Sequence, residues 1–296
     1  MTEEQEIAKQ LPQESISETS LNDSSIPRSE TQPTNMEVHH HPHVEKKNFK
    51  EYFLEFLMIF LAVTMGFFAE TIRENISEDA KAKELAKSLY KEIYADSIAV
   101  QQKIEYRMSK ESASVYFINY VKDSNLTSLS EEFFPSFAMA LINTSTMLFE
   151  PEDGILSQLK NSGALRYFKS IGLQEQIGKL GVSIANVRNR NEKEYSFVEM
   201  YIRPFSLRHF DFNWYNAFTL QGKLSIVEAL RHPDVHVPVK GLISNLDQFK
   251  RKEAENIASY YLLLMRTTRL TIYSEYIKSN RGLLEALRKE YNVEKE

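Results

Sequence analysis

Histidines at metal-ligand spacing are the first side chains to examine for chemistry. They occur twice, as the run His39–His43 and as the pair His232 and His236. Two histidines four residues apart could bind one metal ion from a single helix face. Pro233 lies between them and Pro238 follows, so we expect a loop there instead. No further ligand follows the first run on a periodic element, and that run is typical of a flexible polar spacer. We therefore expect no metal site and no cofactor.

Residues 201–218, YIRPFSLRHFDFNWYNAF, combine seven aromatic side chains with charged ones. Aromatic residues beside arginine are enriched where binding energy concentrates, so this segment is a candidate ligand or partner surface. It could also rest on lipid headgroups, or be a satellite cluster that packs a non-helical crossover against the rest of the domain. The residues we single out for a binding surface are Arg203, Arg208, His209 and Trp214.

Catalytic motifs are absent from the sequence. It contains no Walker loop, dinucleotide fingerprint, HExxH or nucleophile elbow, and it has no cysteine. The leading prediction is therefore not an enzyme, although a membrane-anchored enzyme with its site near residues 201–218 stays as an alternative. The net charge of −5 argues against nucleic acid as a partner.

The densest apolar stretch lies close to residue 60. Phe56 to Ala69 is uncharged and would form about 21 Å of helix, and extension back to Tyr52 gives about 27 Å, close to the bilayer's hydrocarbon thickness. Glu55 lies near the end, where a carboxylate reaches the headgroup layer. We predict a transmembrane helix at residues 52–72. The alternatives are a cleaved signal peptide, which the long preceding tail disfavours, and a core helix of a soluble protein.

One face of this predicted span carries small residues. Ala62 and Gly66 form a small-xxx-small pair that Ala69 extends, with Glu55 on the same face. Such pairs let two helices approach closely in lipid. We predict a homo-oligomer that packs through this face, beside the lipid bilayer itself and a protein partner of unknown identity.

The rest of the chain divides into a tail and a helical domain. Residues 1–45 contain no Phe, Tyr or Trp and no apolar period, which predicts a disordered tail. Residues 77–296 have long apolar stripes at helical spacing. The predicted fold class is all-α: one transmembrane helix followed by an antiparallel helical bundle.

The stripes predict the helices of the bundle in turn. The first runs from Ser77 to about Lys122, either capped at Ser77 or continuous with the span. Its predicted buried stripe is Leu85, Leu89, Ile93, Val100, Ile104, Met108, Val115 and Ile118. Later segments are a helix with Pro135 near its start, one opened by Pro151 and broken or capped at Gly163, a coiled-coil-like stripe from Leu173 to Val187, and two C-terminal helices. The first of these two carries Leu242, Leu246 and Phe249, and the second follows a cap at Asn280.

The segments FKEYFLEFLMIFLAVTMGFFAETIRE and NSGALRYF, in this order, resemble an uncharacterised family of bacterial single-span membrane proteins. Glu55 and Ser162-Gly163 match a glutamate and a Ser-Gly of that pattern, over residues 46–190. The resemblance implies a cell-membrane protein with an extracytoplasmic α-helical domain, because relatives are basic before the span. Counting charges alone does not decide the orientation. The predicted function is an interaction, sensing or scaffolding module.

Overall fold

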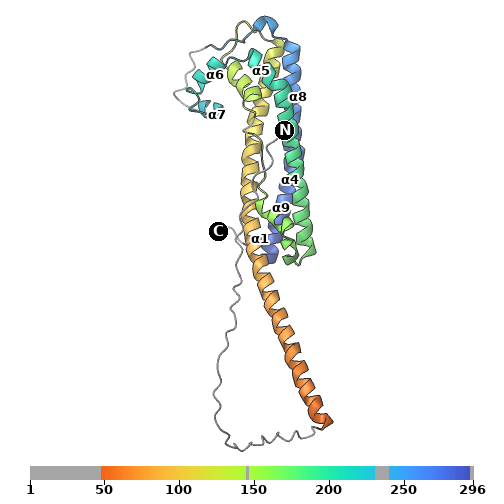
Figure 1. The fold of residues 1–296 in the computed structure, drawn as a ribbon. Helices are drawn as coiled ribbons and strands as arrows, with labels where there is room; N and C mark the ends of the chain where they lie inside the picture. Colours follow the sequence, from red (N-terminus) through yellow and green to blue (C-terminus); the bar gives the residue numbers. More distant parts are fainter. Residues whose placement is uncertain (1–47, 145–146, 231–239, 294–296) are drawn as a thin grey trace, which may run out of the picture. The chain divides into compact units, whose positions relative to one another are not determined.

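The computed structural model describes residues 48–144, 147–230 and 240–293, and these residues are helical or irregular, with no strand (Figure 1). The chain divides into two units, Met1–Phe60 and Leu61–Glu296. The described part of the first unit is the start of one helix. The predictions for the tail at 1–45 and for both histidine groups lie outside the described residues.

Helix α1 (Phe49–Asp123) is 75 residues long. It runs through Ser77 without a break, so the alternative in which the apolar helix continues into the first domain helix is the correct one. Gly66 is the only glycine in it and it contains no proline, so nothing in the sequence interrupts the backbone ladder. Its first buried residue is Ala82, and burial then recurs on one face as far as Val121.

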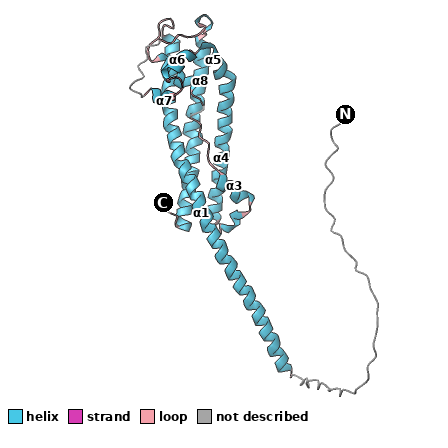
Figure 2. Cartoon of the chain, turned by 60° about the vertical axis from the view of Figure 1, so that its left-hand side comes forward, coloured by secondary structure: helices cyan, strands magenta, loops and turns pink. Residues whose placement is uncertain are grey.

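Three long helical segments lie side by side in the second unit (Figures 1 and 2). They are the domain part of α1, α4 (Ile171–Phe197), and the run formed by α8 (Arg251–Thr267), η5 (Thr268–Tyr273) and α9 (Ser274–Tyr291). Asn280 donates through Nδ2 to the Ile93 carbonyl over 2.8 Å, and the hydroxyls of Ser183 and Ser279 lie 2.8 Å apart. These contacts tie the last run to both other helices.

Shorter elements connect and cap the long segments. Helix α4 continues through η3 (Val198–Ile202) into α5 (Arg203–His209), and η1, η3 and η5 are π-helical. The remaining elements are α2 (Phe133–Phe137), η1 (Ala138–Ile142), α3 (Gly154–Asn161), η2 (Ala164–Tyr167), α6 (Phe212–Phe218), α7 (Ile226–Ala229) and η4 (Leu246–Gln248).

Two apolar clusters form the core of the second unit. One contains Phe117, Phe137, Trp214 and Met265, and the other contains Leu89, Ile177, Tyr276 and Leu283. On each of the three long segments, one or more buried polar residues lie between the residues of one cluster and those of the other. The sequence-based stripe from Leu173 to Val187 is confirmed, because Leu173, Ile177, Leu180, Ile184 and Val187 are all buried.

The helix starts predicted near Pro135 and Pro151 and the helix end predicted at Gly163 match the structure. Pro135 lies in α2, α3 begins at Gly154, and Gly163 follows α3 with a φ of 68°, a backbone conformation that glycine adopts without strain.

Two predicted features of the C-terminal part are wrong. The segment around Leu242 to Phe249 is not the start of a long helix, since α8 begins at Arg251 and Leu242 is exposed. There is also no cap at Asn280, which is a buried residue inside α9. Its side-chain amide bonds to the Ile93 carbonyl of α1. Asparagine is also a common capping residue, so the sequence alone does not separate the two roles.

The predicted stripe of α1 is correct to Ile93 and Val100 but wrong beyond Ile104. Met108 is 52% exposed and Val115 lies at the surface, whereas the buried face continues through Arg107, Lys110, Ser114 and Phe117. Polar residues occupy the core there, and a search for apolar periodicity follows the wrong face when the core residues are polar.

Candidate binding site in the helical domain

A buried ion pair joins α1 to α4 between the two apolar clusters. Arg107 Nη1 and Nη2 donate to Glu194 Oε1 and Oε2 over 3.1 and 3.0 Å, and both side chains are almost completely buried. Burial works against the Arg107 charge, but attraction to Glu194 outweighs it and raises the pKa of the guanidinium. A fork-to-fork pair of this kind is geometrically specific, so it defines how the two helices align.

The last helical run supplies hydroxyls to the same pair. Tyr273 accepts a bond from Arg107 Nη2 over 3.1 Å and another from the Phe149 backbone N–H over 3.0 Å, and Thr268 donates to Glu194. Thr268 and Tyr273 are the first and last residues of η5, and both are buried. They lie five residues apart, whereas neighbours on one face of an α-helix are three or four residues apart. The π-turn therefore lets both hydroxyls reach the ion pair.

Lys110 lies one turn further along α1 and is fully buried. Its Nζ donates to the Asn143 carbonyl over 2.7 Å and lies 5.2 Å from the centre of the Tyr261 ring. Burial, with a smaller contribution from the positive charge of Arg107, lowers the pKa of Lys110 to about 7. The lysine is therefore a group that can lose its charge near neutral pH without leaving its place.

Three further charged residues, Glu111, Arg266 and Arg269, lie on the solvent side of these buried groups. Glu111 accepts from Arg269 Nε and Nη2, both over 2.8 Å, and Arg266 lies 3.5 Å from the same carboxylate. Together with the buried pair these contacts form one polar layer, which we define as Arg107, Lys110, Glu111, Glu194, Thr268, Arg269 and Tyr273.

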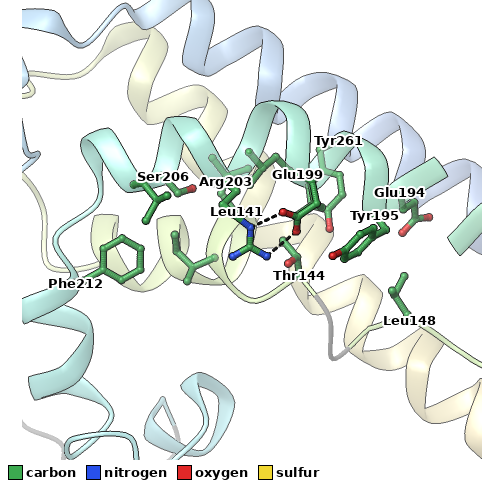
Figure 3. A pocket seen from close by; sticks show the side chains of 14 residues that line it. Leu141, Thr144, Leu148, Glu194, Tyr195, Glu199, Arg203, Ser206, Phe212 and Tyr261 are labelled. Atoms are coloured by element: carbon green, nitrogen blue, oxygen red, sulfur yellow. Dashed lines mark hydrogen bonds and ion pairs between the residues drawn. The ribbon is translucent and has the colours of Figure 1, made fainter. Parts of the chain in front are cut away.

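A pocket of about 350 Å³ opens beside the polar layer. The walls come from η1 and the residues after it, from the consecutive elements α4, η3 and α5, and from α6 and α8 (Figure 3). Its apolar lining is Leu141, Ile142, Leu148, Val198, Ile202, Leu207 and Phe212, and its polar lining is Thr144, Glu194, Tyr195, Glu199, Arg203, Ser206 and Tyr261.

Two of the polar lining residues are buried and have unused hydroxyls. Tyr261 is 0% exposed and Ser206 is 4% exposed, and neither hydroxyl has a hydrogen-bond partner among the described residues. Burial raises the pKa of Tyr261 well above its usual value, so this hydroxyl is neutral and can donate. The lining of the pocket is mainly apolar with a few polar side chains, which is the usual composition of a small-molecule site.

The four residues singled out in the aromatic segment do not converge on one place. Arg203 lines the pocket and pairs with Glu199, with Nε donating to Oε2 over 2.8 Å, and Arg208 is exposed. Trp214 is buried against Phe134 and Phe218 in an apolar cluster. His209 is also buried, with Nδ1 3.1 Å from the Ser244 carbonyl.

Four of the seven aromatic rings in segment 201–218 belong to the core. Its rings at Phe205, Phe210, Trp214 and Phe218 pack into the apolar cluster that contains Phe117 and Phe137. The interpretation as a packing cluster therefore describes these rings correctly, but the segment is helical in α5 and α6 rather than a non-helical crossover. Asp211 caps the N-terminus of α6, and its carboxylate accepts from the Asn213 and Trp214 amides.

The polar layer was missed in the sequence, although a signal for it exists. The buried stripe of α4 continues at the same spacing through Asn191 and Glu194 to Val198, and the stripe of α1 read backwards from Phe117 reaches Ser114, Lys110 and Arg107. Charged residues at positions that periodicity assigns to the core are the observable sign of a buried polar site.

The four residues of the predicted membrane-helix seam all lie on α1. Glu55, Ala62, Gly66 and Ala69 are exposed, and a Cβ added at Gly66 would meet no atom within 4 Å. Within residues 48–144, 147–230 and 240–293, no three His, Asp or Glu side chains lie together as metal ligands would.

Comparisons with known proteins add no family to this description. No protein-family model, no curated protein and no solved structure matches the chain.

Proposed function

We propose that this chain is a single-pass membrane protein whose C-terminal domain, an antiparallel helical bundle, acts as an interaction or sensing module outside the cytoplasm. One observation carries the membrane part. Helix α1 contains an 18-residue apolar window in which no residue is buried, and it is the one helix in the described chain that is long and apolar enough to span a bilayer. Phe56, Met58 and Phe67 are between 64% and 72% exposed.

Such exposure is costly in water. Each Å² of apolar surface left in contact with water costs roughly 25 cal/mol of free energy compared with a buried one. A helix with apolar side chains exposed over several turns is therefore expected to be covered by lipid or by another protein. The buried face of α1 begins only at Ala82, which supports a membrane segment followed by a packed domain. The resemblance to single-span bacterial proteins is part of this proposal.

The alternative of an enzyme near residues 201–218 has weaker support. Ser206 lines the pocket, but its hydroxyl has no hydrogen-bonded base among the described residues, and a catalytic serine requires one. The uncommitted hydroxyls and the apolar walls favour binding. Binding without chemistry is what a sensing module requires.

Two charges placed in the span test the proposal. Met58→Lys with Met65→Lys should move the protein from the membrane pellet to the supernatant, because each lysine at the centre of a span costs about 3 kcal/mol. Met108→Lys is the matched control on the same helix, exposed but within the domain. The measurement is ultracentrifugation of lysates with immunodetection. A wild-type chain that stays in the detergent-free supernatant would refute the proposal and favour a soluble helical protein.

A further inference from the structure

An apolar groove lies on the surface of the domain between two of its long helical segments. Its walls are α4 with η3 on one side and α8 on the other (Figure 1), and its volume is about 670 Å³. Met200, Tyr201 and Tyr260 line it and are between 50% and 62% exposed. The Phe197 ring lies between the two tyrosines, with its centre 5.1 Å from that of Tyr201 and 4.8 Å from that of Tyr260. Exposed apolar side chains that gather in one place are typical of an interaction site.

The composition of the groove is that of a protein–protein interface. Aromatic residues, methionine and arginine are enriched in such interfaces and supply much of their binding energy. The groove contains two exposed tyrosines, a methionine and Arg190. A groove between two helices that lie side by side accommodates a further helix, which places its apolar face in the groove.

One end of the groove is positively charged. Lys193 and Arg190 line it, and neither forms an ion pair with another residue of the described chain. Glu192 is the one acidic residue of the lining, and it points about 100° away from Lys193, to the side opposite Arg190 and Phe197. Glu192 also lines the neighbouring hollow beside Arg188. The groove is therefore complementary to a partner that carries carboxylates next to its apolar face.

The position of the groove argues against lipid and against a second copy of the chain. Glu194 pairs with Arg107, and roughly 50 Å of α1 separates Arg107 from residue 72, the end of the predicted span. The headgroup layer of the same membrane does not extend that far. Two copies in one membrane are parallel, so a symmetric contact through this groove would bring Lys193 and Arg190 against the same cations of the other copy.

We propose that this groove binds an amphipathic helix of another protein, with its apolar face against Phe197, Met200 and Tyr260 and with acidic side chains beside Lys193 and Arg190. The inference gives the proposed interaction module a class of partner, and the exclusion of lipid and of a second copy rests on the proposed function. The apolar lining and the free cations do not depend on a membrane.

Two synthetic peptides of about 18 residues, or five helical turns, test the class of partner. Both carry the same leucines at helical spacing, and one has glutamates and the other lysines on its flanks. Fluorescence anisotropy of each labelled peptide with the full-length protein in zwitterionic lipid nanodiscs measures binding, with empty nanodiscs as background. The acidic peptide should bind at least about tenfold more tightly than the basic one. Equal binding, tighter binding of the basic peptide, or no binding above background would overturn the proposal.

A reversal of charge tests the positive end of the groove. Lys193→Glu with Arg190→Glu should invert the preference, so that the basic peptide binds more tightly than the acidic one. Lys179→Glu is the matched control, because Lys179 is exposed on the same helix and lies outside the groove. A double variant that still prefers the acidic peptide would refute the site.

A pair of apolar positions with equal exposure tests the wall. Met200 and Val182 are both 62% exposed, and only Met200 lines the groove. Met200→Ser should weaken binding of the acidic peptide by about three- to tenfold, and Val182→Ser should not change it. Both variants should keep the wild-type melting temperature. Unchanged binding by Met200→Ser would remove the apolar wall from the site.

The other occupants of the groove give different results. Weaker self-association of Met200→Ser in single-molecule photobleaching, together with unchanged peptide binding, would show that the groove joins two copies. Loss of peptide binding in anionic nanodiscs would show that lipid headgroups occupy it. Either result would overturn the proposal. The pelleting of Met58→Lys with Met65→Lys tests the span separately, so a failure of the groove is distinguishable from a failure of the membrane assignment.

Discussion

Lys110 is the residue whose charge depends most directly on its surroundings. It is fully buried, its amine bonds to the Asn143 carbonyl, and it faces Arg107, Glu194 and the Tyr261 ring. Burial lowers the pKa from 10.5 to about 7 in the folded chain. Between these two values the unfolded chain binds more protons than the folded one, so stability rises with pH across that window and is lost as pH falls toward 7.

Replacement of Lys110 should remove this pH dependence. Between pH 7 and 10 the free energy of unfolding of the wild type should rise relative to Lys110→Met, by at most about 1.4 kcal/mol per pH unit. Urea unfolding followed by circular dichroism at several pH values measures the difference. Lys91→Met, on the same helix but exposed, should change in parallel with the wild type. Parallel curves for the wild type and Lys110→Met would contradict the lowered pKa.

Asp96 shows that burial does not shift every pKa in the same direction. Its carboxylate accepts from the Tyr276 hydroxyl over 2.6 Å and from the Glu152 amide over 3.2 Å, yet burial outweighs both bonds and raises the pKa to about 6. Burial penalises the charged form of any group, so it lowers the pKa of a lysine and raises that of an aspartate.

Among the elements, α1 combines two roles that the sequence presents as separate segments. Its N-terminal part is apolar and exposed, and its later part is packed from Ala82 onward.

Gly66 provides the test of the predicted seam on this helix. Gly66→Ile should weaken self-association of the full-length protein in detergent or lipid, because it prevents close approach of two helices at the small-residue face. The substitution has open space around it in the single chain, so it should not disturb the fold. Chemical crosslinking through lysine amines, or single-molecule photobleaching, measures the number of chains in the oligomer.

The control for the seam is Phe60→Ile, which lies on the opposite face of α1 by helical spacing and should leave association unchanged. Equal association of the wild type and Gly66→Ile would rule out the seam formed by Glu55, Ala62, Gly66 and Ala69.

At the scale of the whole molecule, the proposed membrane protein has two possible orientations, with the helical domain inside or outside the cytoplasm. Within about twelve residues of the predicted span, Lys46, Lys47 and Lys50 precede it and Arg73, Lys81 and Lys83 follow it. These numbers are equal, so the positive-inside rule makes no choice, and the proposal of an extracytoplasmic domain depends on the resemblance alone.

Protease added to intact spheroplasts tests this orientation. Digestion of the domain beyond Ser77 is expected, with the tail protected until the membrane is opened by detergent. A cytoplasmic marker protein that stays intact is the control for the membrane barrier. Full protection of the domain before detergent would reverse the assigned topology.

The sequence alone determined the all-α class, the apolar stretch at 52–69, the stripe from Leu173 to Val187, the helix start near Pro135 and the helix end at Gly163. These follow from periodicity, charge and backbone restriction, which are local properties of neighbouring residues. The tertiary structure decided the continuity of α1 through Ser77 and the single C-terminal run through Asn280. It also decided the burial of Arg107, Lys110 and Glu194 and the pocket that residues of η1, α5 and α8 line together. Arg107 and Glu194 neutralise each other in the core although they are 87 residues apart in the sequence, and local pattern carries no information about such a partner.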